Sequence, residues 1–160
     1  MENEKKGCPE PETNGRNMRR FELGGYALNV DVDRTRAYYS RVHGIGCDCA
    51  GCRNYEKAAA LFPEAVKALM EEMGISPEKP AEVYINGALC EGKSVSYGGF
   101  YHLCGAMEGE VPAPETIIAP GYAVWFRREC DLLDEAFPRP AIQMEIDFRV
   151  PWVLDEENTY

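Results

Sequence analysis

Alternation between apolar and polar residues predicts β-strands at several places along the chain. The clearest example runs from Ile142 to Trp152, where apolar positions alternate with charged or amide side chains. One face of such a strand is apolar and the other is charged, which is typical of a sheet that covers a core on one side only. Shorter runs with the same period predict further strands at 26–32, 81–85, 94–107, 117–118 and 122–128.

Between the first of these strands and the rest, the apolar period becomes that of α-helices. Asp33 is a suitable N-cap for a short helix that reaches Val42. A second helix is expected from Asn54 to Phe62, and a third follows Pro63 and ends at Gly74. The pattern predicts an α+β fold, in which an antiparallel sheet of about five or six strands packs against two or three helices inserted after the first strand.

The length and composition fit one globular domain. The chain has 160 residues, of which 45% are hydrophobic and 28% are charged. Residues 1–19 carry almost no apolar side chains and are expected to form a flexible polar leader, so the predicted domain spans residues 20–160. The sequence shows no run of about 20 apolar residues and no signal peptide. We therefore expect a cytoplasmic protein that does not contact a membrane.

The net charge is strongly negative. With 17 Lys and Arg against 27 Asp and Glu, it comes to −10, which disfavours binding to nucleic acid. The basic pairs at 19–20 and 127–128 are too few to reverse this balance. The charge supports one weaker hypothesis, that the protein is an acidic inhibitor that mimics nucleic acid and competes with it for a basic partner.

The cysteines form the most unusual feature of the sequence. There are seven of them, an odd number, and without an export signal this favours metal binding or free thiols over a disulfide framework. Cys47, Cys49 and Cys52 lie close enough in sequence for their thiolates to converge on one zinc ion. Gly51 permits the tight turn that this requires, and the helix expected at Asn54 would direct its positive N-terminus at the sulfur atoms.

A zinc ion takes four ligands, and the fourth is less plain from the sequence. His43 is nearest and completes the predicted set with the cysteine cluster. His102 and Cys104 are alternatives, because both lie on the same face of one predicted strand. An open catalytic zinc site would also need a general acid or base nearby, so a closed structural site is the favoured interpretation.

The sequence contains no phosphate-binding glycine loop and no nucleophile elbow. The leading hypothesis is therefore a non-enzymatic module that binds another protein and is held together by structural zinc. The alternative is an enzyme, either a thiol-redox protein or a small metalloenzyme, that uses Cys49, Cys52 and His102. A hairpin turn at 91–93 would place Glu82 across from His102. Such a pair can act as a general acid–base device, but it is more often a cross-strand polar pair on a solvated face.

The cysteine cluster belongs to a longer pattern. Cys52 is followed directly by Arg53, Asn54 and Tyr55. Further segments contribute to the pattern: Leu61-Phe62-Pro63, Gly74-Ile75, Tyr97-Gly-Gly-Phe-Tyr-His102, Phe137-Pro-Arg-Pro140, Met144-Glu-Ile and Pro151-Trp-Val-Leu. From about residue 20 to residue 160 the chain resembles an uncharacterised family of small bacterial proteins with a CxCxxCRNY motif. The resemblance implies a shared domain and a significant cysteine motif, but no reaction, substrate or partner.

Overall fold

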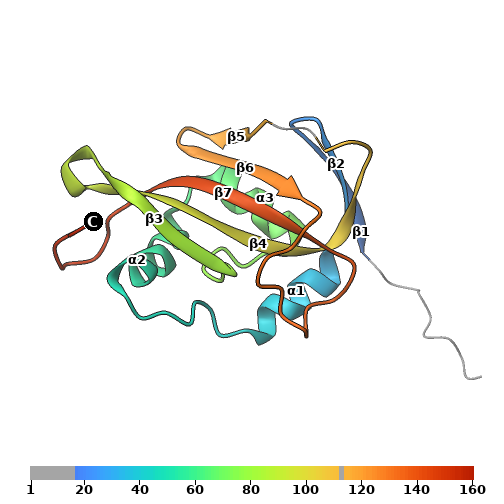
Figure 1. The fold of residues 1–160 in the computed structure, drawn as a ribbon, viewed down its shortest axis with the longest axis horizontal. Helices are drawn as coiled ribbons and strands as arrows, with labels where there is room; N and C mark the ends of the chain where they lie inside the picture. Colours follow the sequence, from blue (N-terminus) through green and yellow to red (C-terminus); the bar gives the residue numbers. More distant parts are fainter. Residues whose placement is uncertain (1–16, 112–113) are drawn as a thin grey trace, which may run out of the picture.

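An antiparallel sheet of seven strands forms the frame of the molecule (Figure 1). The computed structural model describes residues 17–111 and 114–160, so most of the expected leader, like Cys8, lies outside the described residues. The strands are β1 (Met18–Leu23), β2 (Tyr26–Asp31), β3 (Glu82–Leu89), β4 (Ser94–Glu108), β5 (Thr116–Ala119), β6 (Tyr122–Arg127) and β7 (Ala141–Pro151). Their order is β1-β2-β4-β7-β6-β5, and β3 also pairs with β4.

Three α-helices pack against one face of this sheet (Figure 1): α1 (Val32–Arg41), α2 (Ala50–Ala58) and α3 (Glu64–Met73). Tyr55 of α2 and Met70 of α3 are buried against Tyr97 of β4 and Phe148 of β7 in one core. The predicted α+β class with an antiparallel sheet is therefore confirmed. None of the helices in the described part of the chain is long and apolar enough to cross a membrane.

The strand that the hydrophobic pattern did not predict is β1. Phe21 is its one buried residue, so the strand lacks the alternation that the other strands show. A hairpin at Gly24 and Gly25 pairs β1 with β2 along its whole length, and both glycines have positive φ values. Pairing with β2, rather than burial of its side chains, therefore forms this strand. Because β1 precedes the first predicted strand, the helices follow the second strand of the chain rather than the first.

Strand β4 is shared by two neighbours on one of its edges. Its first half pairs with β3 and its last residues pair with β2, while β7 covers the other edge. Between β3 and β2, the Tyr39 hydroxyl of α1 donates to the His102 carbonyl at 2.8 Å and accepts from the His102 N–H at 3.0 Å. Thr35 accepts from the Cys104 N–H at 3.0 Å. Helix α1 thus bonds to three backbone groups of β4 in the stretch between β3 and β2.

The β3–β4 hairpin has a different register from the one that the sequence predicted. Glu82 pairs with Phe100, and His102 lies beside Gln143 of β7. A short 3-10 turn at Cys90–Gly92 and an irregularity between Ile85 and Gly87 shift the pairing. The expected Glu82–His102 pair is therefore wrong.

Candidate metal centre

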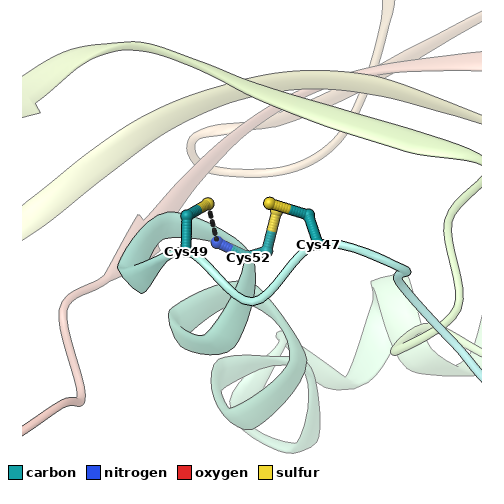
Figure 2. A group of neighbouring side chains, drawn as sticks. All are labelled: Cys47, Cys49 and Cys52. Carbon is teal, nitrogen blue, oxygen red and sulfur yellow. Dashed lines mark hydrogen bonds between the residues drawn. The ribbon is translucent and has the colours of Figure 1, made fainter.

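The cysteine cluster lies where the loop after α1 enters helix α2 (Figure 2). Cys49 is the N-cap of α2, and its Sγ accepts a hydrogen bond from the Cys52 backbone N–H at 3.4 Å. The helix therefore begins at Ala50 rather than at Asn54 as predicted, and Cys52 lies in its first turn. The sequence did not indicate this start, because a thiol is a weak acceptor and is not among the residues that usually cap helices.

The thiols of Cys47, Cys49 and Cys52 converge. Their Sγ atoms all lie within 4.8 Å of one another, and in Figure 2 they lie on the same side of the loop. The thiols are free, with Cys47 and Cys49 exposed and Cys52 buried. Zinc–sulfur bonds of about 2.3 Å hold the sulfurs of a tetrahedral site about 3.8 Å apart. The cluster can therefore hold a metal ion after small side-chain adjustments.

The surroundings of Cys49 and Cys52 shift the pKa values of these two thiols in opposite directions. The hydrogen bond from the Cys52 backbone N–H lowers the pKa of Cys49 from 9.0 to about 7, and the hydroxyl of Tyr160 contributes in the same direction. Burial raises the pKa of Cys52, and its contacts with the other two thiols raise it further. Of these two thiols, Cys49 thus becomes a thiolate more readily, and the thiolate is the form that binds metals and attacks disulfides.

The residues that follow the cysteines fix the position of α2. Asn54 is fully buried, and its side-chain amide donates to the Pro151 carbonyl at 3.1 Å and to the Tyr97 hydroxyl at 3.2 Å. Its Oδ1 accepts from the Val153 N–H at 2.7 Å. Tyr97 in turn donates to the Gly51 carbonyl at 2.7 Å. The first turn of α2 is therefore tied to the sheet without any contribution from a metal.

The loop before the cluster is held as well. The Glu56 carboxylate accepts from the Ile45 N–H at 3.1 Å, and the Arg53 side chain donates to the Asp48 carbonyl at 3.2 Å. Arg53 also pairs with Glu156 in the segment after β7. These contacts hold the three thiols near one another before a ligand arrives, which lowers the entropy cost of binding one.

Within the described residues, the group of potential ligands consists of the three cysteines. His43, the nearest predicted fourth ligand, is exposed and is not a member of this group. His102 and Cys104 are buried in β4, where the His102 ring bonds to the Gln143 side chain at 3.1 Å. The structure thus brings together three of the predicted ligands and leaves the fourth a prediction.

A pocket of about 220 Å³ lies beside the cluster. Cys49, Gly51 and Cys52 form one wall of it, and the other residues come from β3, β4 and the segment after β7: Val83, Tyr84, Ile85, Tyr97 and Tyr160. Sequence reasoning assigned none of these five residues to the site. They are far from the cysteines in the chain, and no local motif marks them.

His102 lines a different pocket, of about 250 Å³, together with Tyr38, Tyr39, Lys79 and Asp134 among others. Burial lowers the pKa of the His102 imidazole, so this ring is neutral at physiological pH. A site that uses Cys49, Cys52 and His102 together is therefore not assembled in one pocket.

Comparison with known protein families, characterised proteins and solved structures finds no match to this chain. The resemblance of the CxCxxCRNY segment to small bacterial proteins is thus still a prediction. A functional assignment depends on the fold and on the geometry of the cysteine cluster.

Proposed function

We propose that Cys47, Cys49 and Cys52 bind one zinc ion and that the protein is a non-enzymatic module that binds another protein. The observation that carries the proposal is the convergence of three Sγ atoms within 4.8 Å at the start of α2. Zinc is the natural occupant of a thiolate-rich structural site. The ion would join the end of the α1–α2 loop to the first turn of α2.

A protein partner is supported by the aromatic surface next to the cluster. Tyr84 and Tyr160 line the adjacent pocket and are 49% and 48% exposed. Exposed tyrosines are enriched at protein interfaces, because they contribute a large contact area with little loss of side-chain entropy. We place this function in the cytoplasm, where a reducing environment keeps thiols available for a metal.

The test of the metal site is the mass of the intact protein under native and denaturing conditions. We expect one zinc ion in the native protein, lost on denaturation, and no zinc in the Cys47→Ser, Cys49→Ser and Cys52→Ser variants. Cys90→Ser is the matched control, because Cys90 is also exposed and lies outside the cluster. A folded, reduced wild-type protein that takes up no zinc would contradict the proposal.

The same cluster supports a second candidate function, in thiol–disulfide exchange. Cys49 is exposed at the N-terminus of a helix, and Cys52 is buried one turn later. In this arrangement the Cys49 thiolate attacks a partner's disulfide and forms a mixed disulfide. Cys52 then displaces the partner as a thiol, so the Cys49–Cys52 pair loses two electrons and the partner's disulfide is reduced.

Metal-free protein in a glutathione redox buffer tests this candidate. The Cys49–Cys52 disulfide is expected to form reversibly, and Cys52→Ser is expected to accumulate a mixed disulfide at Cys49. Cys104→Ser serves as the control, because this other buried cysteine lies outside the cluster. If both thiols of the wild type stay reduced throughout the titration, the redox function is excluded.

A further inference from the structure

The cysteine cluster supplies one ligand fewer than zinc ordinarily takes. Three side chains from the described residues meet at the cluster, whereas a tetrahedral site has four ligands. His102 bonds to Gln143 and lines the other pocket, and Cys104 is buried in β4. Among the described residues the remaining candidate is therefore the exposed His43, after a movement; otherwise the fourth ligand comes from outside the described part of the chain.

The pocket beside the cluster is lined by two of the three cysteines. Cys49 and Cys52 both line it, so a molecule in this pocket is in contact with the ligands of the ion. Its volume of about 220 Å³ is smaller than the roughly 300–1,000 Å³ of drug-sized sites. The space therefore suits a group no larger than a single side chain or a small ring.

The walls of the pocket favour an apolar group. Val83 and Ile85 offer aliphatic surface. The Tyr97 hydroxyl donates to the Gly51 carbonyl at 2.7 Å, and the Tyr160 hydroxyl accepts from the Gly51 N–H at 3.1 Å. Since both hydroxyls are already bonded to the backbone, these tyrosines present mainly their ring surfaces to a ligand.

We infer that the pocket binds an apolar thiol whose sulfur is the fourth ligand of the metal. The inference rests on the proposed metal site and adds the class of molecule that completes it. The thiol binds as a thiolate and its proton passes to solvent, so no oxidant or reductant is needed. A free low-molecular-weight thiol and a partner's cysteine with an apolar neighbour share this chemistry.

Cobalt substitution tests the inference separately from the proposed function. Co²⁺ bound by the cluster gives thiolate-to-cobalt charge-transfer absorption, and its absence would contradict the metal site itself. Benzyl mercaptan is then expected to increase this absorption in a saturable way, while benzyl alcohol leaves it unchanged. Since a buried phenyl ring contributes binding free energy, benzyl mercaptan should bind at least about tenfold tighter than 2-mercaptoethanol. Cobalt binding with no response to either thiol overturns the inference alone.

Two variants of the pocket provide a second test. Val83→Phe fills the space and Tyr84→Ala removes a half-exposed wall, so both should weaken benzyl mercaptan binding about tenfold or more while the cobalt site still forms. Ile117→Ala, which removes an exposed side chain of β5 outside the pocket, is the control. Unchanged affinity in both pocket variants would contradict the proposed position of the thiol.

The His43→Ala variant tests whether His43 is the fourth ligand, and a cysteine-containing dipeptide tests whether the thiolate comes from a protein. If His43 is the fourth ligand, His43→Ala alters the cobalt spectrum before any thiol is added, and this result overturns the inference. An unchanged spectrum supports it. A blocked Phe-Cys dipeptide that binds tighter than benzyl mercaptan would identify a partner protein as the source, and weaker binding would identify a small-molecule thiol.

Discussion

One pocket of this protein is lined by Cys49 and Cys52 and another by His102, and the two differ in how these side chains are paired. At the cysteine cluster, two of the three thiols are exposed and all three are free. At the other pocket, the His102 ring bonds to Gln143, whose amide nitrogen donates to Glu145 at 2.7 Å and to Asp131 at 3.2 Å. Arg127 pairs with both of these carboxylates.

This contrast in pairing indicates which of the two sites is available for a ligand. Because the Gln143 amide nitrogen donates to two carboxylates, its oxygen is the acceptor, and the bonded nitrogen of His102 carries the proton. The network is satisfied from within, which is typical of polar groups that hold a loop on a sheet. The thiols have no comparable set of partners, so the cluster is the site where a ligand adds interactions.

Metal removal is expected to have the largest effect. With free zinc buffered about a thousandfold above its dissociation constant, the ion adds about 4 kcal/mol to the free energy of unfolding. A chelator should remove this contribution in the wild type and change nothing in Cys49→Ser. Urea denaturation with and without chelator measures both. Equal stability of the wild type under the two conditions would show that the cluster holds no stabilising ion.

Breaking the His102 network is expected to cost slightly less. Gln143→Leu leaves His102, Glu145 and the Asp131 N–H without their shared partner, so we expect a loss of about 3 kcal/mol in the free energy of unfolding. Zinc binding should persist, since the network is outside the cluster. Arg149→Met, an exposed change on the same strand, is the control and should stay within about 0.5 kcal/mol of wild type. A small loss in Gln143→Leu would mean that the network contributes little.

Acid should weaken the fold through His102. Burial holds its folded-state pKa below the 6.5 of the free side chain, so the unfolded chain binds the proton more readily. The contribution of His102 to the free energy of unfolding is therefore fully present above pH 6.5 and is lost as the pH drops through the folded-state pKa. The nearby carboxylates of Asp131 and Glu145 raise the pKa of His102 and so reduce this loss. The decline should be smaller in His102→Gln, compared by urea denaturation of metal-free protein. Identical pH profiles for the two proteins would remove His102 as its cause.

The last prediction concerns the order in which the thiols of the cluster react, which should leave the stability of the protein almost unchanged. In metal-free protein, Cys49 should be alkylated first, at a rate that rises through pH of about 7, because its pKa is lowered. Cys52 should react slowly, because it is buried and its pKa is raised. Peptide mass spectrometry after brief iodoacetamide treatment measures both sites. Zinc should protect Cys49, and the exposed Cys90 is the internal control; faster alkylation of Cys52 than of Cys49 would contradict this order.

The fold class could be predicted because the period of apolar residues reports which face of an element is buried. The strand from Ile142 and the helix that ends at Gly74 both follow such a pattern, and both are present. The pattern did not predict strand β1, because this strand is mostly exposed and depends on pairing with β2. Periodicity also says nothing about register, which is why Glu82 was placed two residues away from its true partner.

The spacing of Cys47, Cys49 and Cys52 in the sequence was enough to predict a shared ligand, because all three lie within six residues. Their convergence within 4.8 Å also depends on the start of α2 at Ala50 and on the contacts of Arg53 and Glu56. The surroundings of the three cysteines, in contrast, follow from the tertiary structure. The pocket wall from Val83 to Tyr160 and the bonds of Asn54 to Pro151 and Val153 join segments that are distant in the chain. Such contacts depend on strand pairing and on the packing of the whole core, so no local spacing of residues encodes them.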